Sequence, residues 1–545
     1  MQLSPSAHTD TFTRDNLPPF DQWPEFIFDL PELKYPERLN CAVELLDRTI
    51  ERYGADRPCL LTPSETWTYG DLLRRANQIA RVLVEDCGLV PGNRVLLRAP
   101  NNPWLVACWF GVLKAGGVVV TTMPLLRESE LRTIGEIAKI NLSLVDHRFV
   151  DALAAADIAP YLVFGGDGSD DLTVKAAGKA EDFEAVDTAA DDVALLAFTS
   201  GTTGRPKATM HFHRDVLANA DTFSRYVLKP TCDDVFTGSP PLGFTFGLGG
   251  LVVFPLHAGA STLLLEKGTP DLLLPAMLEH KVTIVFTAPT AYRAMLSELP
   301  PAGLPHLRAG VSAGEPLPKA TWEAWYEATG IKLIDGIGST EMLHIFISAA
   351  GDDIRPGSTG KPIPGYVAAV VDDNGEPVPD GEIGRLAVKG PTGCRYLYGD
   401  RQTQYVQNGW NITGDTYLRD ADGYFWYQAR SDDMIISAGI NIAGPEVEQA
   451  LLTHPDVVEC AVIGAPDPER TMIVKAYVVL RDGVAADEAK IEDLRAHCKQ
   501  KIAPYKCPRE FEFVSALPRT STGKVQRFVL REQAAAQATA EPAAP

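Results

Sequence analysis

The sequence is short of positive charge. Its 545 residues include 50 Lys and Arg against 71 Asp and Glu, which gives a formal net charge of −21 at pH 7. Nucleic acid and anionic membranes would repel such a chain, so we expect neither to be its main partner. An anionic ligand would have to be bound by local basic groups.

Paired cysteines and an export signal are also lacking. The nine cysteines stand singly and without a CxxC pair, which favours reduced thiols in a cytoplasm. The first sixteen residues lack the basic and then apolar order of a signal peptide, so no export is expected. The apolar stretch 104–125 is interrupted by Lys114, Gly116 and Gly117, which favours a buried helix followed by a buried strand over a membrane span.

What the sequence does contain is a series of short apolar, β-branched runs. They alternate with segments that carry apolar residues at helical spacing, such as residues 69–86. Strands that are apolar on both faces and alternate with helices predict an α/β fold with layered, mostly parallel sheets. The runs are residues 94–100, 116–122, 193–200, 261–266 and 282–289.

The length predicts two or more domains, and the pattern of expected helices, strands and turns changes twice along the sequence. After residue 355, turn-rich pieces such as residues 372–390 indicate hairpins and a small β-rich section. A compact α+β pattern follows residues 426–451. We therefore expect an N-terminal domain over residues 1–431, a small C-terminal α+β domain over 432–533 and a disordered tail over 534–545.

The stretch LAFTSGTTGRPKAT, residues 196–209, crowds glycine, serine and threonine around Lys207. It is not a Walker A loop, because Pro206 replaces the glycine before the lysine and Ala208 replaces the hydroxyl that binds magnesium. A hydroxyl-rich loop can still wrap a polyphosphate, with Lys207 as a nearby point charge. On composition alone, a plain surface loop explains the stretch equally well.

Five motifs in order resemble those of the adenylate-forming superfamily, which includes acyl-CoA synthetases, peptide synthetase adenylation domains and luciferases. The resemblance extends over essentially the whole chain. It implies an enzyme that uses ATP and Mg²⁺ to convert a carboxylic acid into an acyl adenylate and then transfers the acyl group to coenzyme A. The motifs are residues 196–209, DGIGSTEM (335–342), TGD (413–415), YQARSDDMI (427–435) and PRTSTGKVQR (518–527).

The resemblance also implies roles for individual residues. Lys524 would stabilise the charge that builds during adenylation, Thr340 would contact the α-phosphate and Glu341 would hold magnesium. Asp415 and Arg430 would bind the ribose hydroxyls, although singly they could also be a turn cap and a surface ion pair. The rest of the ATP site would comprise Thr199, Ser200, Gly201, Thr202, Thr203, Gly204 and Lys207 at the β- and γ-phosphates, Ala313, Gly314, Glu315, Pro316, Asp335, Gly336 and Ile337 at the adenine, and Gly338, Ser339 and Tyr427.

Two further positions relate to the second half-reaction. Asp432 matches the hinge about which the family's C-terminal domain swings, and Gly439 matches the position that lines the pantetheine tunnel. Coenzyme A is the expected acceptor because no carrier module with its serine follows in the sequence. A free-standing carrier protein remains an alternative.

The acid site resembles that of the benzoate-CoA ligase group, and within it the 2-aminobenzoate-CoA ligases. The resemblance rests on GSTEMLHIFIS (338–348), GFTFGLGG (243–250) and the N-terminal residues 17–47. It implies an acid site in which Phe246 walls off a flat ring, Gly338 leaves room for it and His344 closes the far end, with Thr245 beside them. A core aromatic and a structural histidine are the alternative interpretations of Phe246 and His344.

Other functions share part of this pattern. A medium-chain fatty acid-CoA ligase or a luciferase-like oxygenase would carry the same motifs. A module that only hydrolyses or senses ATP would leave Lys524 and Asp432 unexplained. The sequence leaves the oligomeric state open between a monomer and a homodimer.

Overall fold

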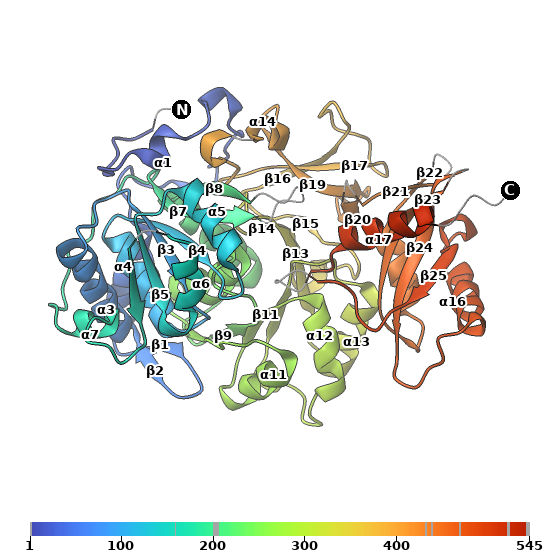
Figure 1. The fold of residues 1–545 in the computed structure, drawn as a ribbon, viewed down its shortest axis with the longest axis horizontal. Coiled ribbons are helices and arrows are strands. Elements are labelled where there is room, and N and C mark those ends of the chain that lie inside the picture. The colour runs from blue at the N-terminus through green and yellow to red at the C-terminus, as the bar shows by residue number, and fades with distance from the viewer. Residues whose placement is uncertain are drawn as a thin grey trace.

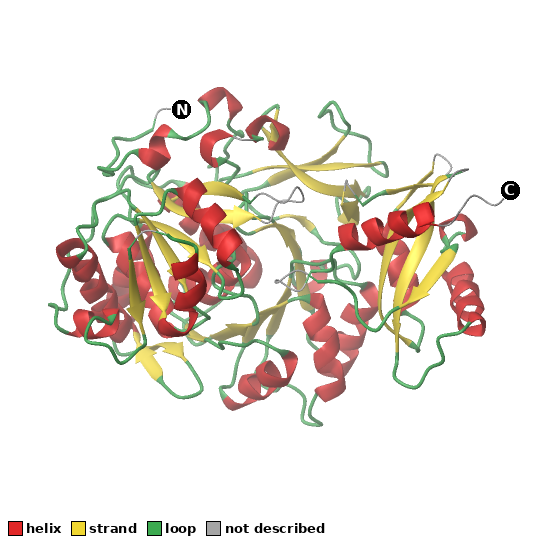
Figure 2. Ribbon diagram, viewed as in Figure 1, coloured by secondary structure: helices red, strands yellow, loops and turns green. Residues whose placement is uncertain are grey.

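The computed structural model describes residues 3–158, 160–199, 206–399, 401–430, 433–437, 440–467, 470–519 and 524–540. Two large sheets with their helices form the main body, a smaller β section lies over it, and the last elements form a lobe at one end (Figure 1). Figure 2 shows helices and strands interspersed throughout, as an α/β fold requires.

The strands form four sheets. The six-stranded sheet has the order β6 (Tyr161–Phe164), β5 (Leu142–Asp146), β3 (Arg94–Arg98), β4 (Val118–Thr122), β7 (Val193–Thr199) and β8 (Lys207–Phe212). The nine-stranded sheet has the order β15 (Lys361–Pro362), β14 (Ile345–Ser348), β13 (Leu333–Gly338), β12 (Ala309–Ser312), β11 (Ile284–Thr287), β9 (Val235–Gly238), β10 (Ser261–Leu263), β1 (Pro58–Leu61) and β2 (Thr66–Thr68).

The two smaller sheets come later in the chain. The first has the order β16 (Val367–Val371), β17 (Ile383–Lys389), β19 (Trp410–Arg419) and β18 (Val406–Gln407), with β20 (Phe425–Arg430) paired to β19. The second, in the C-terminal lobe, has the order β22 (Ile440–Ile442), β21 (Ile435–Ser437), β24 (Thr471–Leu480) and β23 (Val457–Asp467), with β25 (Glu510–Phe513) paired to β24.

The helices fall into three groups along the chain. Those before β8 are α1 (Phe12–Asp15), α2 (Arg48–Tyr53), α3 (Tyr69–Arg81), α4 (Pro103–Lys114), α5 (Glu128–Ala138), α6 (Val150–Ala155) and α7 (Leu172–Ala177). The middle group is α8 (His213–Asn219), α9 (Thr245–Leu248), α10 (Phe254–His257), α11 (Pro270–Glu279), α12 (Pro289–Met295), α13 (Lys319–Thr329) and α14 (Gln402–Tyr405). The C-terminal lobe contains α15 (Gly444–Leu452), α16 (Glu488–Lys501) and α17 (Arg527–Ala540).

The six-stranded sheet is buried on both faces, as its apolar runs predict. On β3, Val95 and Leu97 join the core that contains α3 and α4, whereas Leu96 between them joins the core that contains α5. Because successive side chains of a strand point to opposite faces, a strand covered by helices on both sides needs apolar residues throughout. The predicted mostly parallel sheet is confirmed: β6, β5, β3, β4 and β7 are parallel, and only β8 runs antiparallel.

The nine-stranded sheet follows the same principle. Its central strands β10, β9, β11, β12 and β13 are parallel. Phe286 of β11 faces the large core that the two sheets share, and Val285 faces a second core filled by α11, α12 and α13. The apolar stretch 104–125 becomes α4 and β4, and none of the described helices has the length and apolar character to cross a bilayer.

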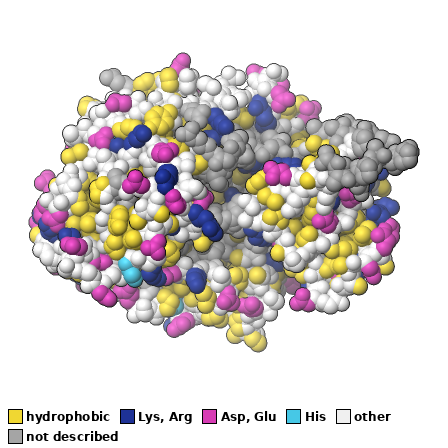
Figure 3. Space-filling model, in the orientation of Figure 1, with side chains coloured by type: hydrophobic (Ala, Val, Ile, Leu, Met, Phe, Trp, Pro, Cys, Tyr) yellow, Lys and Arg dark blue, Asp and Glu magenta, His cyan; other side chains and the backbone are white. Residues whose placement is uncertain are grey.

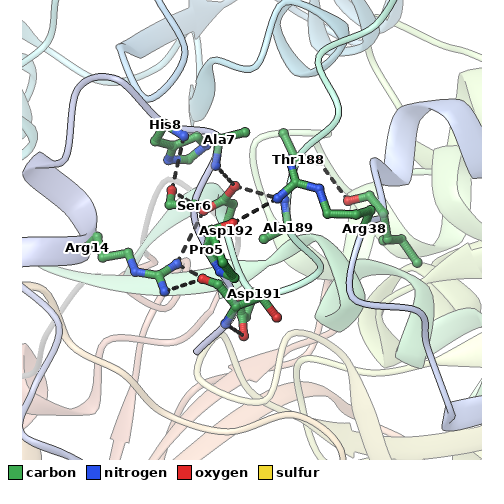
Figure 4. A network of polar contacts seen from close by, with 12 residues as sticks. Pro5, Ser6, Ala7, His8, Arg14, Arg38, Thr188, Ala189, Asp191 and Asp192 are labelled. Atoms are coloured by element: carbon green, nitrogen blue, oxygen red, sulfur yellow. Dashed lines mark hydrogen bonds and ion pairs between the residues drawn. The ribbon is translucent and has the colours of Figure 1, made fainter. Parts of the chain in front are cut away.

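The N-terminal segment is fastened to the start of β7. The Asp192 carboxylate accepts hydrogen bonds from the backbone of Ala7 and of Ala189, each at 2.9 Å. Arg14 lies 3.4 Å from the same carboxylate and 3.7 Å from that of Asp191 (Figure 4). Since Asp192 directly precedes β7, this network fixes the strand that leads into the predicted phosphate loop.

The C-terminal end differs from the expected tail. Helix α17 continues past residue 534 to Ala540, with Leu530 and Ala534 buried against β23 and β24. The low-complexity alanines that suggested disorder are good helix formers, and Ala534 among them packs against the sheet. The proposed domain boundaries at 431 and 533 stay predictions.

Candidate active site

The ends of β7 and β8 frame the predicted phosphate loop. These strands pair antiparallel, and Thr199 lies directly opposite Lys207 at the mouth of the connection. Both residues are half-buried. The loop residues predicted to hold the phosphates, Ser200, Gly201, Thr202, Thr203 and Gly204, lie outside the described residues, so their roles stay predictions.

Tyr396 contacts both Lys207 and Glu341. The Tyr396 hydroxyl donates to Glu341 Oε1 at 2.6 Å, and Lys207 Nζ lies 5.2 Å from the centroid of the same ring. Burial and the negative charge of Glu341 raise the pKa of the Tyr396 phenol, so the phenol stays protonated and donates. Tyr396 therefore contacts both a cation and an oriented carboxylate.

The loop that carries Thr340 and Glu341 is held from several elements. His211 Nε2 on β8 is 2.8 Å from the Thr340 carbonyl, and burial lowers the pKa of His211 to about 3, so the neutral ring donates through this nitrogen. Thr392 donates to the Met342 carbonyl at 2.8 Å. Leu343 has φ +71°, a conformation that side chains rarely adopt and that persists only where surrounding contacts enforce it.

The predicted adenine residues lie at neighbouring strand ends. Ser312 of β12 pairs with Asp335 of β13, and the loop after β12 turns at Gly314, whose φ is +90°. Burial raises the pKa of Asp335 to about 7, and its Oδ1 is buried without a hydrogen-bond partner in the described chain. The other predicted residues, Ala313, Glu315, Pro316, Gly336, Ile337 and Ser339, lie in the same two segments.

The predicted ribose residues are neighbours across two strands. Asp415 of β19 pairs in register with Arg430 of β20, and their charged groups lie 3.6 Å apart. A Cβ on Gly414 would lie 2.5 Å from Arg430 Nη2, so the glycine lets the guanidinium lie over the backbone. Tyr427 is half-buried on the same strand as Arg430. The ion pair agrees both with a ribose site and with a structural pairing.

Lys524 reaches this site from the C-terminal lobe. A Cβ on Gly314 would lie 4.0 Å from Lys524 Cε. Lys524 is exposed, yet loss of hydration lowers its pKa, and the charge of Asp415 opposes that shift. Figure 3 shows Lys and Arg side chains around the middle of this face, beside the lobe.

Polar contacts join the lobe to the main body. Arg519 lies 3.6 Å from Glu315, in the loop after β12. Arg293 of α12 donates to the carbonyl of Val457 in β23 at 3.0 Å. The predicted hinge Asp432 and the predicted tunnel residue Gly439 lie outside the described residues, and their roles stay predictions.

The predicted acid site is only partly assembled as expected. Thr245 and His344 line one pocket with Asn219, Leu248, Gly249 and Leu343. The rings of Phe246 and His344, however, touch each other, with centroids 5.7 Å apart. A substrate ring therefore cannot lie between them in this structure, and the pocket lies beside the pair instead.

Gly338 also has a different reason to be glycine. It pairs with Ile345 in the β13–β14 hairpin, and a Cβ there would lie 2.5 Å from the His344 carbonyl oxygen. The close approach of backbone is enough to exclude a side chain at this position, and the predicted role of Gly338 at the substrate ring stays a prediction.

Comparisons with known proteins identify the family of the chain. A model of the AMP-binding enzyme family matches residues 46–398, and a model of the AMP-binding enzyme C-terminal domain matches residues 446–524. The chain belongs to the AMP-binding enzyme family. The predictions of the adenylate-forming family, of its fold and of an AMP-forming acid–thiol ligase are thereby confirmed.

Relatives of this AMP-binding enzyme include aromatic acid ligases. The benzoate–CoA ligase of Thauera aromatica is 36% identical over 512 residues, which are 92% of this chain and 97% of that protein. The crystal structure of an anthranilate CoA ligase in complex with anthranoyl-AMP has a TM-score of 0.88 and 37% identity, covering 94% of this chain and all of that one. A benzoate CoA ligase from Burkholderia xenovorans LB400 has a TM-score of 0.83 and 32% identity, covering 90% and 100%.

Sequence reasoning missed three residues that the structure of this AMP-binding enzyme brings to the site. They are His211, Tyr396 and Asn219, which touch the Thr340 backbone, Glu341 and the acid pocket respectively. The sequence MHFHRD around His211 directly follows the lysine motif and offered a local signal. Tyr396 and Asn219 offered none, because Glu341 is 55 residues from Tyr396, and Asn219 shares its pocket with Thr245 and His344 from other parts of the chain.

Proposed function

We propose that this enzyme activates a one-ring aromatic carboxylic acid, 2-aminobenzoate or benzoate, with ATP and transfers the acyl group to coenzyme A. The products would be aryl-CoA, AMP and pyrophosphate. The observation that carries the proposal is the position of Lys524, which the C-terminal lobe places beside Gly314 and within electrostatic reach of Asp415 and Glu341.

The chemistry explains why a lysine is needed there. A carboxylate resists attack by a thiol, because its charge repels the nucleophile and oxide is a poor leaving group. Attack of the carboxylate on the α-phosphorus of ATP releases pyrophosphate and leaves an acyl adenylate, from which AMP departs when the thiol attacks. Lys524 can bridge the carboxylate and the α-phosphate as negative charge builds there. Positioning and charge stabilisation supply most of the catalysis.

The main body would hold the nucleotide while this happens. Asp415 and Arg430, whose charged groups lie 3.6 Å apart, would bind the ribose, and Lys207 with Thr199 would flank the β- and γ-phosphates. Glu341 fits Mg²⁺, because a single carboxylate completed by phosphate oxygens and water is how proteins usually hold this ion. Bound there, Mg²⁺ would neutralise phosphate charge.

The aromatic acid is supported by the pocket and by the relatives. The pocket beside His344 is lined mostly by apolar residues, among them Val216, Leu248 and Leu343, which favours an acid with an apolar body. Four aromatic rings lie around His344, namely those of Phe223, Phe246, Phe254 and Phe286. These rings make the surroundings of His344 apolar, although other residues line the pocket itself.

ATP–pyrophosphate exchange over a panel of acids tests the proposal. Benzoate and 2-aminobenzoate should support exchange and thioester formation, whereas acetate and octanoate should be poor substrates. Preferential turnover of octanoate would overturn the aromatic assignment in favour of a medium-chain fatty acid ligase. Phosphate release that does not depend on any acid would overturn the ligase itself.

Lys524→Ala separates the two half-reactions. We expect exchange to fall by about 10²- to 10³-fold, because the charge that Lys524 stabilises develops only in the transition state. Thioester formation from a preformed aryl adenylate should largely survive. The matched control is Lys501→Ala, an exposed lysine on α16, which should leave both activities unchanged. Equal losses in both half-reactions would contradict the role given to Lys524.

A further inference from the structure

Asn219 is a buried polar residue in the wall of the acid pocket. It ends α8 and is 3% exposed. Val216, three residues earlier on the same helix, lines the pocket with it, opposite Thr245 and Leu248 of α9. The pocket is otherwise mostly apolar, so a carboxamide in its wall requires an explanation.

The carboxamide is half satisfied. Asn219 Nδ2 donates to the Asp215 carbonyl at 2.8 Å, which fixes the orientation of the amide because a carbonyl accepts only from nitrogen. Asn219 Oδ1 is buried without a hydrogen-bond partner in the described chain. An unpaired buried acceptor is destabilising, so such atoms usually indicate a missing partner.

His344 adds a second unsatisfied polar group to the same pocket. It is 3% exposed, and neither ring nitrogen has a hydrogen-bond partner of ordinary geometry among the described residues. Burial lowers its pKa to about 3, so the ring is neutral and offers one donor and one acceptor. A Cβ on Gly249 would lie 2.3 Å from the His344 ring, so this glycine lets the ring pack closely against the helix at the pocket.

We propose that Asn219 is a specificity-determining residue whose Oδ1 accepts a hydrogen bond from an amino or hydroxyl substituent on the ring of the acid. This inference rests on the proposed function and refines it. The preferred substrate is then an aromatic acid with an N–H or O–H donor on the ring, and unsubstituted benzoate is a poorer one. His344 completes the polar end of the pocket.

The size of the preference follows from what binding leaves unpaired. A donor on the ring satisfies Asn219 Oδ1, whereas an apolar ring leaves it buried and unpaired. We expect a preference of about ten- to a hundred-fold in kcat/KM for one such contact. Shape alone would discriminate between an amino and a methyl group only weakly, because the two groups are similar in size.

The first experiment uses the unaltered enzyme and pairs of acids. Acid-dependent ATP–pyrophosphate exchange is measured for the 2-, 3- and 4-aminobenzoates and for the methylbenzoates with the same substitution pattern. At one ring position, the exchange rate with the aminobenzoate should exceed the rate with the corresponding methylbenzoate by about ten-fold or more. Equal rates within all three pairs would overturn the inference while leaving the aryl ligase in place. Failure of every aryl acid would overturn the proposed function instead.

The second experiment uses Asn219→Leu, which keeps the shape of the side chain and removes both polar atoms. The amino/methyl ratio should collapse to about one, because the aminobenzoate loses its acceptor and the methylbenzoate gains an apolar wall. The matched control is Asn77→Leu. Asn77 is also buried on a helix, donates to a backbone carbonyl at 2.8 Å and has an unpaired Oδ1, but it lies on α3 away from the pocket. An unchanged ratio in Asn219→Leu would refute the role of Asn219.

Discussion

Replacing Tyr396 with phenylalanine removes one hydroxyl, the group that donates to Glu341 at 2.6 Å. The substitution leaves the ring in place, so the contact of Lys207 with that ring is retained. Tyr396 is 1% exposed and Glu341 9%, which leaves little room for water to replace the lost donor. The variant therefore isolates the orientation of the Glu341 carboxylate from the other features of the site.

The expected magnitude follows from the strength of this bond. A hydrogen bond to a charged group contributes about 1.5–3 kcal/mol, which corresponds to about 10- to 150-fold in an equilibrium or rate constant. The carboxylate is held in the same way before and during the reaction. We therefore expect a higher KM for MgATP with a smaller change in kcat, the pattern of a lost uniform binding interaction.

Pyrophosphate exchange at varied MgATP and varied free Mg²⁺ measures the effect. The concentration of Mg²⁺ that gives half-maximal rate should rise, which a general loss of stability would not produce. Tyr398→Phe is the matched control, because Tyr398 donates to the Ile137 carbonyl at 3.0 Å and lies outside this cluster. If Tyr396→Phe and Tyr398→Phe have the same KM and Mg²⁺ dependence as the unaltered enzyme, the role assigned to Tyr396 is wrong.

Three other outcomes are expected. Loss of hydration lowers the pKa of Lys524, so kcat/KM should begin to fall with rising pH below the pKa of an ordinary lysine side chain. A kcat/KM profile that stays flat through pH 10 would contradict this. Gly414→Ala should displace Arg430 and raise the KM for ATP, whereas Gly168→Ala, where a Cβ meets nothing within 4 Å, should not. Gly338→Val should lower the thermal stability and the rate with every acid, and a stable variant that lost aryl acids alone would restore the sequence-based interpretation.

The elements that the sequence predicts well are those set by local pattern. The run at residues 94–100 becomes β3, with alternate side chains in two cores, because a strand buried on both faces must be apolar throughout. The hairpin expected around residues 372–390 forms from β16 and β17. The motif residues Thr199, Lys207, Asp415 and Arg430 also lie where strands end or pair, so their proximity follows from the register of the sheets.

The contacts that escaped prediction depend on tertiary packing. The expectation that a substrate ring lies between Phe246 and His344 treated two motif residues as facing walls, whereas the folded chain packs their rings together. Gly338 was interpreted through the substrate, but its neighbour is the backbone of the next strand. A motif states which residues gather and leaves open which atoms touch, so these contacts could not be foreseen, and the substrate roles of the three residues stay predictions.

The division of the site between two parts of the chain fits a reaction in two steps. Asp415 and Glu341 belong to the main body, and both would be needed as long as the adenylate is bound. Lys524 belongs to the lobe, and in the proposed mechanism its charge would be needed only until pyrophosphate has formed. Two polar contacts between the lobe and the main body, those of Arg519 with Glu315 and of Arg293 with Val457, are of the kind that contribute about 1 kcal/mol or less each. Movement of the lobe between the two half-reactions stays a prediction.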